Sequence, residues 1–217
     1  MTPTILITGF DAFGGQVTNP TSQLLGLLPS KVGNFRIITL ELPTAFGPVA
    51  ALLEQAIRNW RPTYVLAMGQ AGGRDKLSIE RVAINIDDAR IADNEGAQPI
   101  DQPINGSGPA AYFSNLPIKR LVAKLTAAQI PAEVSNTAGT YVCNHVMYQL
   151  LDLQANSYPD MKVGFIHVPY LPEQVSSQST LPSMALETMQ QGIQLVLQTL
   201  AESGQDLDDV RVGGSLH

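Results

Sequence analysis

Short apolar runs of strand length alternate with longer segments of helical periodicity along most of the chain, and this alternation is the strongest constraint on its fold. The pattern is typical of a layered α/β protein, in which helices pack against a central sheet. Strands are predicted at residues 4–8, 35–42, 63–68, 132–136 and 162–168, and helices at 20–28, 46–60, 118–129, 143–153 and 182–202.

The middle of the chain departs from this regular pattern. Residues 76–86 show apolar alternation, whereas residues 87–117 are polar and rich in Gly, Pro and Asp. We therefore expect an excursion around 76–117, made of one or two strands and a long surface loop of the kind that often has a function. No internal repeat and no interdomain linker is found, so residues 1–217 are predicted to form one domain whose last fifteen residues are frayed.

The charge balance and the lack of long apolar runs argue against several partners. Thirteen Lys and Arg residues face nineteen Asp and Glu residues, which gives a net charge of −6 with no basic cluster. We expect neither nucleic acid nor an anionic membrane surface as a partner, because both need clustered positive charge. No secretion signal is visible near the first residues, and no stretch approaches the roughly 18 apolar residues of a membrane span. A cytoplasmic location is therefore expected.

The chain contains one cysteine, Cys143. An intrachain disulfide and a zinc cluster of thiolates are thus excluded, and neither a metal nor another cofactor is expected.

Cys143 is also the clearest candidate for chemistry. It follows a predicted strand and a turn of small residues, at the start of a predicted helix, where the positive end of the helix dipole favours a thiolate. A buried structural cysteine is about as common an outcome for this residue type, so the neighbouring residues must decide between the two interpretations.

A nucleophilic thiol needs an imidazole partner, and the chain offers three histidines. His217 lies in the frayed terminus, and His145 would point about 200° away from Cys143 around a helix. His167 is the better base, because it stands at the end of the predicted strand 162–168. A histidine at a strand end that merely satisfies its own hydrogen bonds is the alternative.

Glu80 is a candidate for the group that orients this imidazole, because it lies inside an apolar strand pattern. A solvated strand surface formed with Arg81 is the alternative, since charged residues are mostly exposed. Composition does not rank Glu80 against the other carboxylates of this region, which are Asp87, Asp88, Asp93 and Asp101.

Ligands of open α/β sheets bind beyond the carboxyl ends of the strands, so we expect the loops at 9–15, 69–73, 136–143 and 167–170 to gather at one edge of the sheet. Two of these loops are rich in glycine, but neither matches a nucleotide-binding motif. Phe10 and Phe13 in the first loop could instead wall a flat, uncharged group.

Five segments together resemble the pyroglutamyl-peptidase I (pyrrolidone-carboxylate peptidase) family of cysteine peptidases. They cover well over a third of the chain, in the order found in the family. The segments are ILITGFDAFGGQVTNPT at 5–21, LPTAF at 42–46, MGQAGGRDKLSIERVAINIDDARIADNEG at 68–96, SNTAGTYVCNHVMY at 135–148 and GFIHVPYLPEQ at 164–174.

The resemblance implies a single α/β/α sandwich domain with a mixed, mostly parallel twisted sheet, and removal of an N-terminal pyroglutamyl residue from peptides. It implies Cys143 as the nucleophile, His167 as the base and Glu80 as the orienting carboxylate. It further implies a homotetramer and a set of substrate-binding residues. These are Phe10, Phe13 and Tyr141 as aromatic walls, Gln70 and Asn19 near the lactam, and Arg90 near the oxyanion.

Many relatives carry Phe at the position of Tyr141, and we expect the added hydroxyl to be tolerated if it meets water or a polar partner.

Two other function classes stay open at this point. A non-catalytic binding module could keep the pocket and lose the chemistry, although the presence of all three catalytic side chains argues against it. Phosphorolysis of a nucleoside is suggested only by the α/β architecture and the glycine-rich loops, which is weak support.

Overall fold

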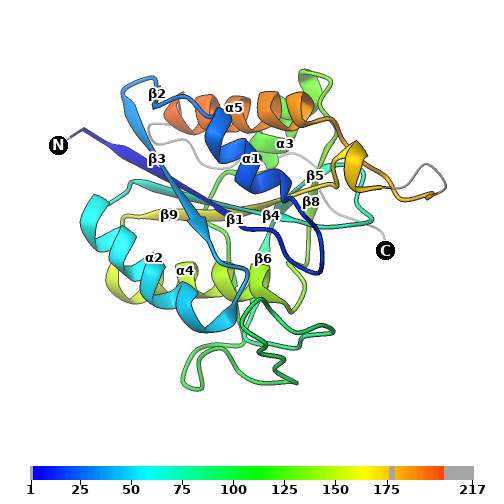
Figure 1. The fold of residues 1–217 in the computed structure, drawn as a ribbon. Helices are drawn as coiled ribbons and strands as arrows, with labels where there is room; N and C mark the ends of the chain where they lie inside the picture. Colours follow the sequence, from blue (N-terminus) through cyan, green and yellow to red (C-terminus); the bar gives the residue numbers. More distant parts are fainter. Residues whose placement is uncertain (1, 176–178, 203–217) are drawn as a thin grey trace.

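Seven strands hydrogen-bond into one sheet in the computed structural model, which describes residues 2–175 and 179–202. The order across the sheet is β2-β3-β1-β4-β9-β5-β8 (Figure 1). The strands are β1 (Thr4–Phe10), β2 (Lys31–Val32), β3 (Phe35–Leu42), β4 (Tyr64–Gln70), β5 (Leu77–Glu80), β8 (Ala132–Ser135) and β9 (Lys162–Val168).

The sheet is mixed. β3, β1, β4 and β9 run parallel to one another, β2 is antiparallel to β3, and β5 and β8 form a parallel pair that is antiparallel to β9. The carboxyl end of β8 therefore points the opposite way from that of β9. The expectation that every strand delivers its following loop to one edge of the sheet is wrong for β8.

Helices cover both faces of this sheet and make three layers. The apolar core on one face contains side chains of α1, α3 and α5, and the core on the other contains side chains of α2 and α4. Figure 1 shows these two groups above and below the sheet. The helices are α1 (Pro20–Leu27), α2 (Phe46–Trp60), α3 (Ile118–Ala127), α4 (Val142–Ser157) and α5 (Leu186–Glu202).

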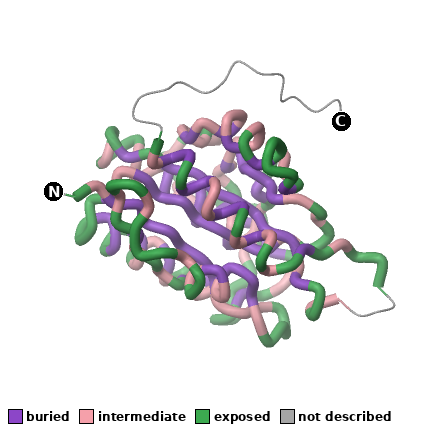
Figure 2. The backbone as a smooth tube through the Cα atoms, turned by 90° about the horizontal axis from the view of Figure 1, so that it is seen from above, coloured by how far each residue is buried: buried purple, intermediate pink, exposed green. Residues whose placement is uncertain are grey.

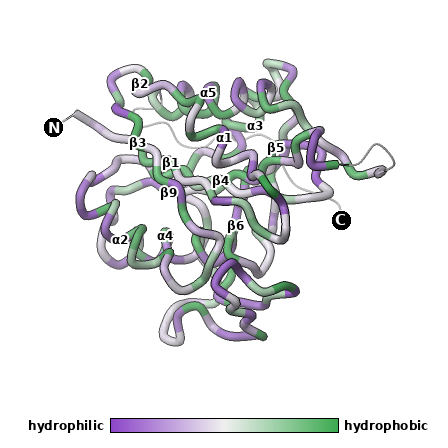
Figure 3. The backbone as a smooth tube through the Cα atoms, viewed as in Figure 1, coloured by the Kyte–Doolittle hydropathy of each residue, from purple (hydrophilic) through white to green (hydrophobic). Residues whose placement is uncertain are grey.

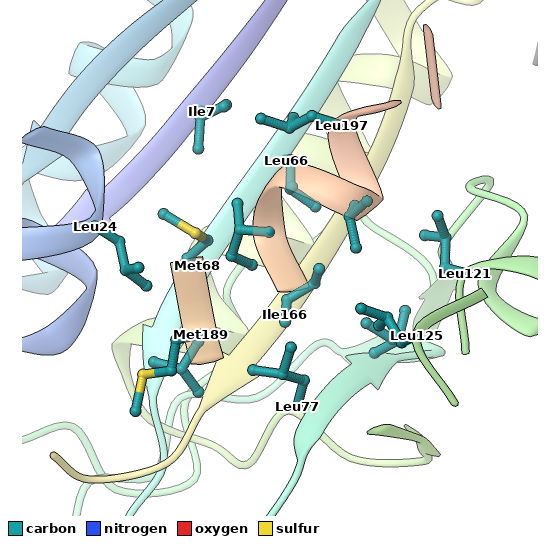
Figure 4. Close-up of a cluster of buried hydrophobic side chains, with 14 of the residues drawn as sticks. Ile7, Leu24, Leu66, Met68, Leu77, Leu121, Leu125, Ile166, Met189 and Leu197 are labelled. Carbon is teal, nitrogen blue, oxygen red and sulfur yellow. The ribbon is translucent and has the colours of Figure 1, made fainter. Parts of the chain in front are cut away.

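Burial on both faces explains why the central strands read as continuous apolar runs. Every residue of β1 and of β4 is buried, and Figure 2 shows buried backbone running through the middle of the molecule with exposed segments around it. Figure 4 shows the core between the sheet and α5, where Leu66 of β4 lies near Leu197 of the helix. Parallel strands covered by helices are expected to have this composition.

The ends of two helices agree with the sequence signals. Asn19 is the N-cap of α1, and its side-chain oxygen accepts a hydrogen bond from the backbone N–H of Thr21 at 3.0 Å. α2 ends where Arg61 adopts the left-handed conformation, directly before Pro62. The amphipathic helix predicted at 46–60 is confirmed at both ends.

The excursion is smaller than expected. β5 lies within the predicted excursion at 76–117 but belongs to the main sheet, so the excursion begins after Glu80. β6 (Val82–Ile84) and β7 (Ala111–Phe113) pair antiparallel, and the polar loops between them extend below the α2–α4 layer in Figures 1 and 3. β7 was not foreseen, because three residues are too few to show a period.

Within the described residues, no helix combines the length and the apolar character needed to span a bilayer. The predicted frayed segment at 203–217 lies outside the described residues, as does His217.

Candidate active site

A cavity of about 430 Å³ opens where the chain leaves β1, β4 and β9. It is also lined by the loop that precedes α4 and by part of the excursion. All of the predicted site residues except Glu80 line it: Phe10, Phe13, Asn19, Gln70, Arg90, Tyr141, Cys143 and His167. Glu80 is completely buried behind this lining.

The β8–α4 connection brings Cys143 to this cavity, although β8 itself points away from it. Gly139 takes a positive φ of 79° in the connection, and Thr140 exchanges two hydrogen bonds with the backbone of Asp88, at 2.9 and 2.8 Å. Cys143 is thereby placed in the first turn of α4 and is half-buried. The interpretation of Cys143 as a sealed structural cysteine is not supported, because it lines the cavity.

Gly69 allows the sulfur to lie against the sheet. A β-carbon added at Gly69 would lie 2.6 Å from Cys143 Sγ and 2.8 Å from Cζ of Phe165, so a larger residue would displace one of them. Gly69 pairs with His167 across β4 and β9. The sulfur therefore lies beside the strand position that carries the imidazole. The sequence marks Gly69 only as the residue after an apolar run, which does not reveal this packing role.

His167 and Glu80 form a buried hydrogen-bonded pair. The Nδ1 atom of His167 lies 2.7 Å from Oε1 of Glu80, and the two side chains are 4% and 0% exposed. An ionised carboxylate only accepts, so Nδ1 carries the proton and Nε2 is the basic nitrogen available to the cavity. The alternative of a solvated Glu80 on a strand surface is wrong.

Arg74 is the residue of this cluster that sequence reasoning missed. Its Nη1 donates to Oε1 of Glu80 at 2.6 Å, and its Nη2 donates to the backbone oxygen of Thr137 at 3.0 Å. The guanidinium supplies the charge that a buried carboxylate needs, whereas Arg81 instead donates from Nε to Asn136. Arg74 lies in a loop beside two glycines, so its sequence context resembles an ordinary solvated turn.

Burial favours the neutral forms of the thiol and of the imidazole. Burial and the negative charge of Glu80 raise the pKa of the Cys143 thiol to about 12, and Arg74 opposes this. Burial lowers the pKa of His167 below its ordinary value, with Glu80 opposing and Arg74 reinforcing the shift. The expected preference for a thiolate at the helix N-terminus is therefore outweighed, and the thiol needs a base to become nucleophilic.

The other histidine and carboxylates of the region have different partners. His145 is not among the residues that line the cavity, and its Nδ1 lies 2.7 Å from Oδ2 of Asp87. Asp93 accepts from three backbone N–H groups, including that of Phe46 at 2.8 Å, so it holds a turn of the excursion. Neither Asp87 nor Asp93 is hydrogen-bonded to His167.

Aromatic rings form one side of the cavity. The rings of Phe13 and Tyr141 have centroids 6.1 Å apart, and Phe46 meets Tyr141 edge to face at 5.4 Å. The hydroxyl of Tyr141 donates to the backbone oxygen of Ala92 at 3.2 Å. The added hydroxyl thus has a polar partner, as the expectation for this residue requires.

The polar residues near these rings differ in their exposure and in the hydrogen bonds that they make within the protein. Asn19 donates to the backbone oxygen of Asp11 at 2.8 Å, and its side-chain oxygen accepts twice from Thr21, so its amide mainly braces the loop before α1. Arg90 is exposed and lines the cavity. Gln70 is 7% exposed and is held by Gln174.

No cluster of three or more His, Cys, Asp or Glu side chains able to hold a metal ion occurs among residues 2–175 and 179–202.

Comparison with known proteins places these features in a family. The family model described as pyroglutamyl peptidase matches residues 3–203. A pyrrolidone-carboxylate peptidase of Staphylococcus saprophyticus is 52% identical over 94% of this chain and 95% of its own length, and one of Levilactobacillus brevis is 48% identical over 93% and 99%.

Solved structures agree with the sequence matches. The pyroglutamyl peptidase I of Bacillus amyloliquefaciens superimposes with a TM-score of 0.90 at 42% identity, over 94% of this chain and all of its own. The pyrrolidone carboxyl peptidase of Thermococcus litoralis gives 0.92 at 38% identity, over 97% and 99%. The expected α/β fold class is confirmed, and the chain belongs to the pyroglutamyl peptidase family.

Proposed function

We propose that this cysteine peptidase removes N-terminal pyroglutamate with Cys143 as the nucleophile, His167 as the general base and Glu80 as the carboxylate that orients it. One observation carries the assignment of the residues. A buried histidine, hydrogen-bonded at 2.7 Å to a buried carboxylate, lines the same cavity as the one cysteine of the chain.

The reaction begins when Cys143 Sγ attacks the carbonyl carbon that joins pyroglutamate to the next residue. His167 Nε2 takes the thiol proton and then gives it to the leaving amine as the C–N bond breaks, which leaves a thioester. A water molecule, deprotonated by His167, attacks the thioester. The C–S bond then breaks, and the proton returns to Cys143. Glu80 stays ionised and stabilises the transient imidazolium.

The backbone N–H groups at the start of α4 are suited to binding the oxyanion. The first N–H groups of a helix have no intrahelical partner, and no side chain among the described residues caps this helix. These groups include the N–H of Cys143 itself, so they can donate to the negative oxygen of the tetrahedral intermediate. We propose Arg90, which lines the cavity, as an additional positive charge near that oxygen.

The rest of the cavity suits an uncharged ring. Pyroglutamate has a lactam in place of a free ammonium, so it needs apolar walls with one donor and one acceptor. Phe10, Phe13 and Tyr141 offer the walls, and Gln70 offers a polar contact for the lactam. Asn19 contributes to substrate binding through the loop before α1, which its side chain braces.

The test is an assay with a reporter amide of pyroglutamate, compared with the same amide of proline. We expect release of the reporter from the first substrate and a specificity constant, kcat/KM, that is lower by a factor of about 10⁴ for the second, because proline leaves the polar groups of the pocket unpaired. Binding of the pyroglutamyl amide without turnover would instead support the non-catalytic module.

The expected pH dependence of kcat/KM follows from a neutral Cys143 thiol and a neutral His167 imidazole. Protonation of His167 removes the base, so kcat/KM is expected to fall on the acid side, with a midpoint below the ordinary histidine value of 6.5. Because the pKa of Cys143 is raised to about 12, kcat/KM should then stay level through neutral pH and above. A bell-shaped profile that declines near pH 8 would instead indicate a preformed thiolate–imidazolium pair.

We also propose a cytoplasmic homotetramer, on the basis of the family resemblance. Exposed apolar side chains in the excursion support self-association, since Ile100 is 73% exposed and Phe113 is 68% exposed. Light scattering should give four times the chain mass of 23.3 kDa. A monomeric mass would refute this proposal and leave the catalytic one intact.

A further inference from the structure

The side-chain amide of Gln174 links Gln70, which lines the cavity, to two backbone groups, at Leu171 and at Thr18. Gln174 is the last residue of a short 3-10 turn, η1 (Pro172–Gln174), that follows β9. Its Oε1 accepts from the backbone N–H of Leu171 at 2.9 Å. Its Nε2 donates to the backbone oxygen of Thr18 at 3.2 Å and to Oε1 of Gln70 at 2.8 Å.

Two backbone groups determine which way this amide faces. A backbone N–H can only donate and a backbone carbonyl can only accept. Rotating the Gln174 amide by half a turn would set two donors against each other at Leu171 and two acceptors against each other at Thr18. The orientation of Gln174 therefore follows from the chain itself, and its NH₂ group must face Gln70.

Gln70 in turn has only one favourable orientation. It must present its oxygen to the NH₂ group of Gln174, so its own Nε2 is left for other partners. Among the described residues, none accepts a hydrogen bond from this nitrogen, although Gln70 is 93% buried and lines the cavity. The cavity therefore has a donor, and not an acceptor, at this point.

We propose that Gln174 is a specificity-determining positioning residue, which orients Gln70 so that its N–H donates to the ring carbonyl of the substrate. This inference rests on the proposed function, because the ring carbonyl is what distinguishes pyroglutamate from proline. Gln174 acts through Gln70, and nothing in its own contacts requires it to touch the substrate.

The discriminating variant is Gln174→Glu. It preserves the size of the side chain and an acceptor for the Leu171 N–H, but its second oxygen faces Gln70. Gln70 is expected to rotate and donate to Glu at 174, which turns its own oxygen toward the lactam carbonyl. We expect KM for the pyroglutamyl amide and the inhibition constant of 2-pyrrolidone, the bare lactam, to rise about 10- to 100-fold with a smaller change in kcat.

Gln174→Met separates this reversal of polarity from the loss of a structural brace. Methionine removes all three hydrogen bonds, but it leaves Gln70 free to keep its donor toward the cavity. The proposal predicts a smaller rise in KM for Gln174→Met than for Gln174→Glu. If Gln174 were only a structural brace, KM would rise at least as much for Gln174→Met as for Gln174→Glu, and that result would overturn the proposal.

Two further variants complete the experiment. Gln154→Glu makes the same chemical change on α4, where the Gln154 amide donates to the backbone oxygen of Pro159, and it should leave KM unchanged. In a Gln70→Leu background, Gln174→Glu should raise KM no further. If the wild type cleaves the pyroglutamyl amide but Gln174→Glu has a normal KM, the inference fails and the proposed function stands. If the wild type does not cleave it, the proposed function itself has failed.

Discussion

Replacing Cys143 by alanine is expected to abolish turnover of a pyroglutamyl amide. The turnover rate should fall by a factor of about 10⁴ or more, which corresponds to a loss of about 5 kcal/mol or more of transition-state stabilisation. The reason is that no other thiol exists in the chain to form the thioester. Binding of 2-pyrrolidone should stay close to that of the wild type, because the aromatic walls and Gln70 are untouched. Release of the reporter amine and calorimetric titration measure these two quantities.

Cys143→Ser is the matched control for this substitution. It preserves the shape of the side chain against Gly69, and a hydroxyl in the same place is a far weaker nucleophile, so it should be nearly as inactive as alanine. Thermal unfolding of both variants should resemble that of the wild type. Substantial turnover by the folded alanine variant would rule out covalent catalysis by Cys143.

Replacing Glu80 by glutamine is expected to lower the turnover rate by about 10²- to 10⁴-fold with KM little changed. The amide oxygen of glutamine can still accept from His167 Nδ1, so the imidazole stays in place. The negative charge that stabilises the imidazolium is lost, however, and the Arg74 guanidinium loses the carboxylate that it contacts at 2.6 Å. Steady-state kinetics, together with the melting temperature, separate the catalytic effect from any loss of folding.

Glu133→Gln is the control for this variant, because it makes the same change on the neighbouring strand β8. Glu133 is 43% exposed and faces Lys76 at 3.4 Å, so its loss should change neither turnover nor stability by much. Near-normal turnover in Glu80→Gln would transfer the orienting role to a different group.

The elements with a strong period were predicted well from the sequence. The helix at 46–60 has apolar residues spaced for one face and ends before Pro62, and the structure places both of its ends as predicted. β3 and β9 are likewise found at 35–42 and 162–168. β9 is buried from Val163 to Val168, as expected of an apolar run covered on both faces, whereas β3 keeps exposed positions between its buried ones.

Strand direction was not predictable in the same way. The pairs Ser78–His167 and Glu80–Ser135 show that β5 and β8 run against β9, but the apolar pattern of a strand is the same in either direction. Cys143 reaches the cavity only because the loop before α4 turns back. Cys143 was therefore predicted to lie at this cavity from an assumption about strand ends that fails for β8.

The site residues that were missed act through packing and pairing across distant parts of the chain. Arg74 contacts Glu80 and the backbone of Thr137, and Gly69 makes room for the sulfur. Gln174 matters through two backbone groups, at Leu171 and Thr18. None of these relations leaves a local period or motif in the sequence.

The central claim is that a thioester forms on Cys143, and acid quenching during turnover followed by peptide mass spectrometry tests it most directly. A pyroglutamyl adduct on the peptide that contains Cys143, absent from Cys143→Ala, is the predicted result. The abundance of this adduct should increase with a substrate whose better leaving group makes thioester formation faster than thioester hydrolysis. An adduct on any other residue, or none under conditions in which hydrolysis limits turnover, would contradict the mechanism.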